Sequence, residues 1–481
     1  MSKAPIIDGI MKYISEKNSL FCTPGHKGGR GFSNSKMGKK LYENIIKMDL
    51  TEVDGLDNLH APVGIIKEAE DRLRDLYGSK KSYFLVNGST SGNLAMIFSC
   101  FNEGDKIIVE RNCHRSIFNG IILRKLNPIY VKNYFDKNIN ASLSIDEEYF
   151  LKVIQENKDA KGIILTYPNY YGVCSDLRNI IKVAKKYKMK VLVDSAHGAH
   201  FGISEGLPQS AVKLGADMVV MSSHKTLPSF TQTAYLHLCG DIEESKVDFY
   251  VSSFLSTSPS YMLMSSMDYA RNYLEDRGKR DYDNLVELCI KYSKKISKIN
   301  GLHVLNSEDL SINGKRLQFD ATRFVINVED GCSGFKLYEY LKENNIQPEM
   351  CDDRNVVLIC SPFDGELQLQ NLYKTLKNCN IIKINDNKNQ FMNLPDIPEI
   401  RFAPYEVLNL KSEKVKIEDS LGKAVKKELV PYPPGIPIIM PGEIINQEII
   451  DCIINFIKAG ITVLGIENQG RDTIIEVVSE N

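Results

Sequence analysis

The sequence predicts an α/β protein with a large domain built on a mostly parallel seven-stranded sheet, a smaller α+β domain and a C-terminal α+β domain. Between Tyr83 and Leu238, short β-rich runs alternate with stretches whose apolar residues recur at helical spacing. The runs are apolar on both faces, which is typical of a parallel sheet covered by helices. A chain of 481 residues is also too long for one ordinary core, which favours two or three domains.

Seven runs supply the expected strands of the large domain. In chain order they read "SYFLVNG", "DKIIVER", "NPIYVKN", "KGIILTYPN", "KVLVDSAH", "DMVVMSSH" and "TAYLHL". Between them lie helical segments such as "LRNIIKVAKKYK", in which apolar residues are three or four positions apart. We therefore expect the large domain to cover residues 46–300, preceded by an N-terminal segment, residues 1–45.

The pattern changes after about Asn300. The segments "GLHVLNSED", "ATRFVINVED", "GFKLYEYLKENN" and "RNVVLICSP" predict the strands and helices of a smaller α+β domain, residues 301–384. The polar stretch from Asn385 to Glu399 contains two prolines and is typical of a linker. It opens the third unit, residues 385–481, which contains the proline-rich "PYPPGIPIIMPGE".

Composition excludes several classes of partner. The sequence has 60 Lys and Arg residues and 61 Asp and Glu residues, which gives a net charge of −1. This balance does not suggest a surface that binds nucleic acid. No run approaches the roughly 20 apolar residues of a membrane span, and the N-terminus lacks the apolar core of a secretory signal. The eleven cysteines are scattered and never paired as CxxC, which suits reduced thiols. We expect a soluble cytoplasmic protein without a disulfide framework or a structural zinc site.

Polar motifs follow four of the expected strands. They are "NGSTSGN", "RNCHRS", "DSAHGAH" and "SSHKT". In a doubly wound sheet, ligands bind beyond the carboxyl ends of the strands, so these motifs are considered together. The first begins a helix, where backbone N–H groups and the hydroxyls of Ser89, Thr90 and Ser91 suit a phosphate. An ordinary Ser/Thr helix cap is the alternative.

The other three motifs each carry one chemical group. His114 could lie flat against an aromatic ring, or it could be an ordinary hydrogen-bonded residue. Asp194 ends a buried strand and suits a protonated pyridine nitrogen. A metal site of Asp194, His197 and His200 is the alternative, which the helix-breaking Gly198 argues against.

Lys225 lies at the end of an apolar run, where loss of hydration makes its amine easier to deprotonate and able to form a Schiff base. The alternative is the solvated end of a strand. A phosphate site, a flat histidine, a carboxylate and this lysine together predict a site for pyridoxal 5'-phosphate.

Seven motifs in order resemble the ornithine/lysine/arginine decarboxylase family of pyridoxal-phosphate enzymes, which have the aspartate aminotransferase fold, fold type I. They are "TPGHKGG", "NGSTSGN", "RNCHRS", "DSAHGAH", "SSHKTLPSFTQ", "STSPSY" and "PYPPGIPIIMPGE". The resemblance covers about residues 20–470. It implies that "TPGHKGGRG" is a substrate-covering loop, and that the reaction is decarboxylation of a basic amino acid.

The resemblance also implies roles for single residues. Lys225 would carry the cofactor as a Schiff base, and Asp194 would face its pyridine nitrogen. His114 would stack on the ring, Ala196 would pack beneath it, and His197 would line the same site. The phosphate would be held by Ser89, Thr90, Ser91, Ser222 and His224. Ser256 and Thr257 would reach the site of the neighbouring subunit, so a homodimer with a shared active site is expected, with higher assembly left open.

Two departures from the family pattern bear on these expectations. The large inducible members begin with a receiver-like domain that this sequence lacks, and several have tryptophan in place of His197. The chain is therefore similar to the short biosynthetic arginine decarboxylases of Gram-positive bacteria. Arginine is the expected substrate, followed by lysine or ornithine.

The sequence leaves three points of the reaction open. The proton donor to the carbanion is Lys225 or a nearby histidine, with His224 the first candidate. The carboxylate for the cationic side chain of the substrate is one of five candidates, because burying a cation without a partner is costly. These are Asp54, Asp57, Asp352, Asp353 and Glu443. An aminotransferase or lyase on the same fold, or a non-catalytic regulatory relative, remains the alternative function.

Overall fold

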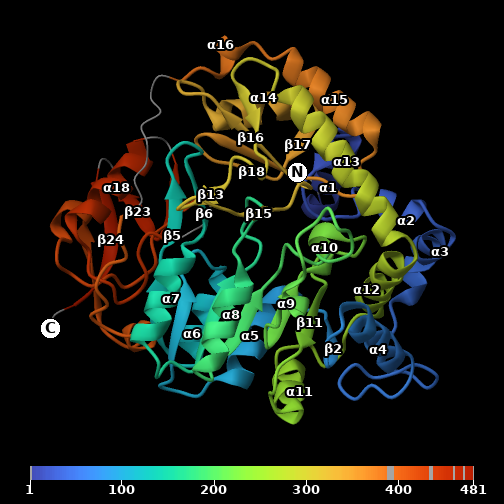
Figure 1. The fold of residues 1–481 in the computed structure, drawn as a ribbon, viewed down its shortest axis with the longest axis horizontal. Coiled ribbons are helices and arrows are strands. Elements are labelled where there is room, and N and C mark those ends of the chain that lie inside the picture. Colours follow the sequence, from blue (N-terminus) through green and yellow to red (C-terminus); the bar gives the residue numbers. More distant parts are fainter. Residues whose placement is uncertain (1–2, 387–394, 433–436, 459–460, 470–471, 480–481) are drawn as a thin grey trace.

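The computed structural model describes residues 3–386, 395–432, 437–458, 461–469 and 472–479. Figure 1 shows three regions: a central sheet with its helices at the bottom, a second layer of strands and helices at the top, and a C-terminal unit at the left. Part of the expected linker, residues 387–394, lies outside the described residues. The division into domains at residues 45, 300 and 384 stays a prediction.

The large sheet contains the seven strands that the sequence predicts. Their order is β2 (Lys81–Leu85), β11 (Ala234–Leu238), β10 (Met218–Met221), β9 (Lys190–Asp194), β7 (Gly162–Thr166), β3 (Lys106–Glu110) and β4 (Asn127–Val131). All neighbouring pairs are parallel except those of β11, which is antiparallel to both β2 and β10. The register places Val220 of β10 opposite Asp194 of β9. The prediction of a mostly parallel seven-stranded sheet is confirmed.

Helices cover this sheet because their apolar residues fall on one face. In α8 (Leu177–Lys186), the buried residues Leu177, Ile180, Ile181 and Ala184 follow the helical repeat, and the Asp176 side chain accepts from the Arg178 N–H at the start. The other helices of this region are α4 (Ile65–Tyr77), α5 (Gly88–Cys100), α6 (Arg115–Leu123), α7 (Glu147–Glu156), α9 (Ala211–Leu214), α10 (Ser223–Thr226), α11 (Glu244–Ser253), α12 (Tyr261–Tyr273) and α13 (Lys279–Ile296).

The smaller region is an antiparallel sheet with helices on one side. Its strand order is β12 (Leu302–Val304), β16 (Arg323–Val328), β19 (Asn355–Ile359) and β18 (Met350–Cys351), and its helices are α14 (Gly334–Glu343), α15 (Glu366–Lys377) and α16 (Ile381–Ile384). The N-terminal segment adds α1 (Pro5–Ser15), β1 (Ser19–Phe21), α2 (Arg30–Ser33) and α3 (Lys36–Asn44). Strand β1 pairs in parallel with β17 (Ile346–Pro348), so the start of the chain joins the smaller region.

The C-terminal unit has its own apolar cluster, which includes Ile417, Ile449 and Val477. Its elements are α17 (Pro404–Val407), β20 (Ser412–Lys416), β21 (Val430–Tyr432), α18 (Gln447–Lys458), β22 (Thr462–Leu464), β23 (Ile466–Gln469) and β24 (Asp472–Val478). A buried ion pair fastens this unit to the large region, with both Arg111 terminal nitrogens 2.7 Å from Glu443 oxygens. Within the described part of the chain, no helix is both long and apolar enough to cross a membrane.

Candidate active site

The candidate site lies where β9 and β10 end. Asp194 is the last residue of β9, and Lys225 lies in α10, which follows β10 directly. Because β9 and β10 are parallel neighbours, both residues are delivered to the same edge of the sheet. In Figure 1, α10 stands on the side of the large sheet that faces the smaller region.

Asp194 is a buried carboxylate that retains unused acceptor capacity. It is 2% exposed, and its two oxygens accept from Asn93 Nδ2 at 2.8 Å and from the Ala196 N–H at 3.0 Å. A carboxylate has about four acceptor positions, so roughly two remain. Among the described residues, no Lys or Arg side chain forms an ion pair with Asp194. A buried carboxylate in this state suits a cationic ligand group.

Lys225, His197 and Arg323 form a chain of hydrogen bonds. Lys225 Nζ lies 2.9 Å from His197 Nε2, and His197 Nδ1 lies 2.9 Å from a terminal nitrogen of Arg323. His197 is 5% exposed and Arg323 1%. Burial lowers the pKa of Lys225, and the charge of Asp194 partly opposes this shift. Burial also lowers the pKa of His197 well below its usual value, and the charge of Arg323 lowers it further.

His114 belongs to the same site through a polar network. It caps α6, with its Nδ1 2.7 Å from the Ser116 hydroxyl, and that hydroxyl accepts from Asn93 Nδ2 at 2.8 Å. Asn93 thus links His114 to Asp194. The ring of His114 is accessible from the site, but neighbouring atoms remove much of its hydration, which lowers its pKa; Asp194 opposes this shift and Lys225 adds to it.

The start of α5 has the features that a phosphate site needs, and the expected role of its hydroxyls stays a prediction. The first turn of a helix leaves backbone N–H groups without partners in the helix, and Ser89, Thr90 and Ser91 occupy that turn. The fully buried Ser222 donates its hydroxyl to Ser89 Oγ at 3.0 Å, which brings the end of β10 to the same place. Ser91 donates to the Gly88 carbonyl at 2.8 Å, so its hydroxyl is already in use.

His224 has one ring nitrogen committed to the backbone. Its Nδ1 lies 2.8 Å from the Thr233 carbonyl oxygen, which can only accept, so Nδ1 carries the hydrogen. Burial lowers the pKa of His224, which favours the neutral ring and leaves Nε2 as an acceptor. For His224 to act as a proton donor, Nε2 must first gain a proton, and an adjacent phosphate would favour this.

The loop from Thr23 to Gly29 is packed against the lysine-bearing helix. The Gly25 N–H donates to the His224 carbonyl at 2.7 Å, and a Cβ at Gly25 would lie 2.5 Å from the Thr226 carbonyl carbon. Only glycine permits this approach. Lys27 in the same loop is fully buried and donates to the carbonyl of Ile359 in β19. The expected substrate-covering loop therefore connects α10 with the smaller region.

Three of the five expected carboxylates have their acceptors in use elsewhere. Asp57 accepts backbone N–H groups around the start of α4, Asp352 binds Tyr171, Arg354 and Asn355, and Glu443 forms the buried pair with Arg111. Asp54 is exposed on the surface. Burial raises the pKa of Asp353 to about 6.

Sequence reasoning missed Glu349, a carboxylate beside the site. Its charge acts on both Lys225 and His224, in each case raising the pKa of the neighbour against the effect of burial. It accepts from the Thr23 N–H at 2.8 Å and from the Tyr170 hydroxyl at 2.9 Å. The Tyr170 ring in turn lies edge-on to His197, with ring centroids 4.8 Å apart.

Ser256 and Thr257 are exposed in the loop before α12, outside the polar network around Lys225. The Ser256 carbonyl lies 2.8 Å from His60 Nε2. The expected contribution of these residues to a neighbouring subunit stays a prediction.

The three residues of the alternative metal site have different hydrogen-bond partners. Asp194 and His197 have the partners given above, and His200 Nε2 lies 3.1 Å from the Asp320 carboxylate. Within the described ranges, no cluster of three or more His, Cys, Asp or Glu side chains could hold a metal.

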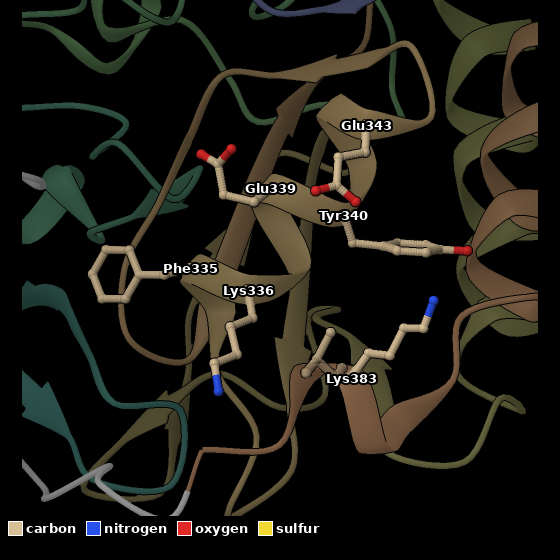
Figure 2. A pocket seen from close by; sticks show the side chains of 7 residues that line it. Phe335, Lys336, Glu339, Tyr340, Glu343 and Lys383 are labelled. Carbon is tan, nitrogen blue, oxygen red and sulfur yellow. The ribbon is translucent and has the colours of Figure 1, made fainter.

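A cavity of about 400 Å³ lies away from this site, on the smaller region. Figure 2 shows Glu339, Tyr340 and Glu343 from α14 on one side of it and Lys383 from α16 on the other. None of the residues predicted for the active site lines it.

The residues at the sheet edge fit pyridoxal phosphate. The unpaired Asp194 carboxylate suits a pyridinium nitrogen, the turn at Ser89 suits a phosphate, and the half-buried Lys225 suits the aldehyde. Ala196, which is 8% exposed, adds a small buried side chain beside Asp194, as the expected packing under the ring requires. The site can therefore bind a flat, anionic aldehyde between two strand ends.

Comparison with known proteins gives one family for most of the chain. Residues 4–366 match the model described as Orn/Lys/Arg decarboxylase, major domain, and residues 387–464 match its C-terminal domain. The chain is 32% identical over 485 residues to the arginine decarboxylase of Bacillus subtilis (strain 168), covering 99% of this chain and 98% of that protein. It is 36% identical over 463 residues to an uncharacterized Bacillus subtilis protein, YaaO, covering 92% of each.

Solved structures share the fold. The lysine decarboxylase LdcF of Francisella novicida superposes with a TM-score of 0.81 at 24% identity, covering 96% of this chain and 79% of that one. A serine palmitoyltransferase from Sphingomonas wittichii gives a TM-score of 0.57 at 14% identity, covering 75% and 86%. These similarities confirm the predicted fold type I. With the two family models matched in order, the chain belongs to the Orn/Lys/Arg decarboxylase family of pyridoxal-phosphate enzymes.

Proposed function

We propose that this chain decarboxylates a basic amino acid, with arginine as the preferred substrate and lysine and ornithine next. The observation that carries the proposal is the placement of a pKa-lowered lysine and a buried, unpaired carboxylate at neighbouring strand ends. The arginine preference is supported by the 32% identity with the Bacillus subtilis arginine decarboxylase over nearly the whole chain. The inducible lysine decarboxylase of Escherichia coli (strain K12) is 24% identical and is covered over 75% of its length.

Pyridoxal phosphate, when bound, supplies the electron sink for loss of the carboxylate. Asn93 and the Ala196 N–H orient the Asp194 carboxylate. Burial keeps the Lys225 amine easier to deprotonate, which makes it a better nucleophile. His224 offers Nε2 as a site that can take up and return a proton.

Glu349 is the carboxylate that we assign to the cationic substrate. Its charge raises the pKa of both Lys225 and His224. Glu349 accepts from Thr23 and Tyr170 beside the site, whereas Asp57, Asp352 and Glu443 bind groups elsewhere in the fold. A basic side chain that leaves water needs a fixed negative charge nearby.

An assay of all twenty amino acids for carbon dioxide release, with the product amines identified, tests the proposal. We expect release from arginine above all others and its loss in Lys225→Ala. Keto acids or cleaved fragments without carbon dioxide would instead indicate an aminotransferase or a lyase. Failure of the purified chain to take up pyridoxal phosphate would overturn the enzyme assignment.

We also propose that two copies of the chain share their sites, in the cytoplasm. The support is the exposed loop with Ser256 and Thr257, which lies outside the polar network that the described residues form around Lys225. Complementation tests this assembly. Lys225→Ala and Thr257→Trp should each be inactive alone, and mixing them should restore activity because one site of a mixed dimer carries neither change. Absence of any restoration after verified subunit exchange would contradict a shared site.

A further inference from the structure

We propose that Arg323 is a positioning residue that acts through His197 to hold Lys225 as the free amine. The inference deepens the proposed function and rests on it, because it concerns the lysine of the same site. It follows from the directions of two hydrogen bonds, which the chemistry of the three side chains fixes.

The first bond fixes the tautomer of His197. An arginine side chain has only N–H donors, so His197 Nδ1, 2.9 Å from the Arg323 nitrogen, must accept. A neutral imidazole carries one hydrogen, which therefore lies on Nε2. A doubly protonated ring would place two donors against each other at Nδ1.

The second bond then fixes the state of Lys225. His197 Nε2–H donates, so Lys225 Nζ, 2.9 Å away, must accept through a lone pair. An ammonium group has no lone pair, and it would face a second donor. The chain Arg323, His197, Lys225 is therefore consistent only with an uncharged lysine.

The surroundings of Arg323 argue against a purely structural role. The guanidinium is 1% exposed, yet Nε and its second terminal nitrogen have no hydrogen-bond partner among the described residues. Burying a cation with so few partners costs stability. Arg354, in the bend just before β19, is a contrast: it is 8% exposed and binds the Val328 carbonyl and the Asp330 carboxylate.

The other charged groups around Lys225 act in both directions. Asp194 on β9 and Glu349 beside β18 favour the ammonium form, whereas Arg323 on β16 and burial oppose it. We call the hydrogen-bonded chain Arg323–His197–Lys225 the relay. His197 is its central member, and His114 and His224 are the histidines whose charges act on it. Asp320, which forms the ion pair with His200, is close enough to Arg323 for the positive charge of Arg323 to lower the pKa of the Asp320 carboxyl. Because His197 contacts Lys225 directly, we expect this hydrogen bond, rather than the opposing charges, to determine the protonation state of Lys225.

Competitive labelling of the full chain, freed of cofactor, measures the state of Lys225 without any decarboxylation. Acetic anhydride in trace amounts acylates a lysine only in its unprotonated form, and mass spectrometry of the Lys225 peptide gives the labelling rate at each pH. We expect Arg323→Met to move the midpoint of this profile upward by about 1 pH unit. The variant loses the positive charge of Arg323 and the hydrogen bond that fixes the tautomer of His197. Arg323→Lys, which keeps a charged donor, should stay close to the wild type. Arg354→Met is the matched control for loss of a buried guanidinium and should not move the midpoint.

A double-mutant cycle separates the relay from a simple charge effect. In a His197→Phe background, Arg323→Met should cause less than half of its shift, because the connecting ring is gone. An equal shift in both backgrounds, or no shift from Arg323→Met, would overturn the proposal. If Arg323→Met does not fold, the ¹⁵N spectrum of histidine-labelled wild type decides the question. The signal lost in His197→Phe must then belong to an Nε2–H tautomer, and an Nδ1–H tautomer would refute the relay.

Because none of these readouts involves turnover, the proposed function can fail while the relay holds. The reverse also applies: an active decarboxylase with an unchanged labelling midpoint in Arg323→Met would retain its function without the relay.

Discussion

Two buried arginines serve different ends in this protein. Arg111 meets Glu443 with two bonds of 2.7 Å and a further contact to the Ile438 carbonyl at 3.3 Å, between the large region and the C-terminal unit. Arg323 is buried more completely but makes one hydrogen bond to a described side chain, that of His197. A fully partnered buried charge holds parts of the fold together, whereas an underpartnered one marks a site.

The largest expected effect concerns the unpaired carboxylate of the site. Asp194→Ala should lower carbon dioxide release by about 10³-fold, because a preorganised charge is lost where charge develops. Stability should fall only modestly, because Asn93 Nδ2 and the Ala196 N–H lose one acceptor each. Turnover and thermal unfolding are measured on the same preparation. Turnover within a few-fold of the wild type would remove Asp194 from the mechanism.

Arg111, whose charge is paired, should affect stability more than activity. Arg111→Met leaves Glu443 buried without a cation and should cost about 3–5 kcal/mol in the unfolding transition of the C-terminal unit. Denaturant unfolding followed by fluorescence measures it. Arg115→Met is the control, since Arg115 is exposed in its pair with Glu428 and should cost no more than ~1 kcal/mol. Equal losses in both variants would erase the distinction between buried and exposed pairs.

Glu349 tests whether a half-partnered carboxylate serves the substrate. Glu349→Gln should raise KM for the basic amino acid about tenfold and change kcat less, because a charge that pairs with the substrate cation is lost. Glu343→Gln, on α14 of the same region, is the control and should behave like the wild type. A fall in kcat with KM unchanged would assign Glu349 to the chemical step instead.

The smallest expected effect concerns Glu70, a buried acid that forms no ion pair with another described residue. Burial raises the pKa of Glu70 to about 8, while its Oε1 accepts from the Phe84 N–H. Since the folded pKa lies above the unfolded value, the protonated form favours folding, and stability falls as pH rises from about 4.5 to 8. Glu70→Gln should therefore unfold at higher temperature than the wild type at pH 9 but not at pH 4.5. A difference that is the same at both pH values would contradict this linkage.

Residues that follow their own strand were predictable, and residues contributed across the fold were not. The shared position of Lys225 and Asp194 at one sheet edge was predictable because each follows an apolar run, and parallel strands bring such ends together. The antiparallel direction of β11 could not be predicted, because the run "TAYLHL" does not indicate how a strand is oriented relative to its neighbours. Arg323 and Glu349 lie in ordinary strand surroundings about 100 residues or more from Lys225, and only the fold places them beside it.

Asn93 shows an intermediate case. It belongs to the motif "NGSTSGN", yet its position one turn after the hydroxyls hides its contact with Asp194. A helical projection places Asn93, four residues after Ser89, on the same face of α5, but it does not identify Asp194 as its partner.

The pairing of the chain's first strand with a late one sets the order in which the enzyme is completed. Thr23 donates to Glu349, 326 residues further along, and β1 extends the same contact to β17. During synthesis the N-terminal segment therefore lacks its partner strand until most of the chain has been made. Closing so long a loop is slow compared with the local contacts of the large sheet. The contact between Thr23 and Glu349 is thus among the last to form, so partly made chains carry Lys225 without the charge of Glu349 that acts on it.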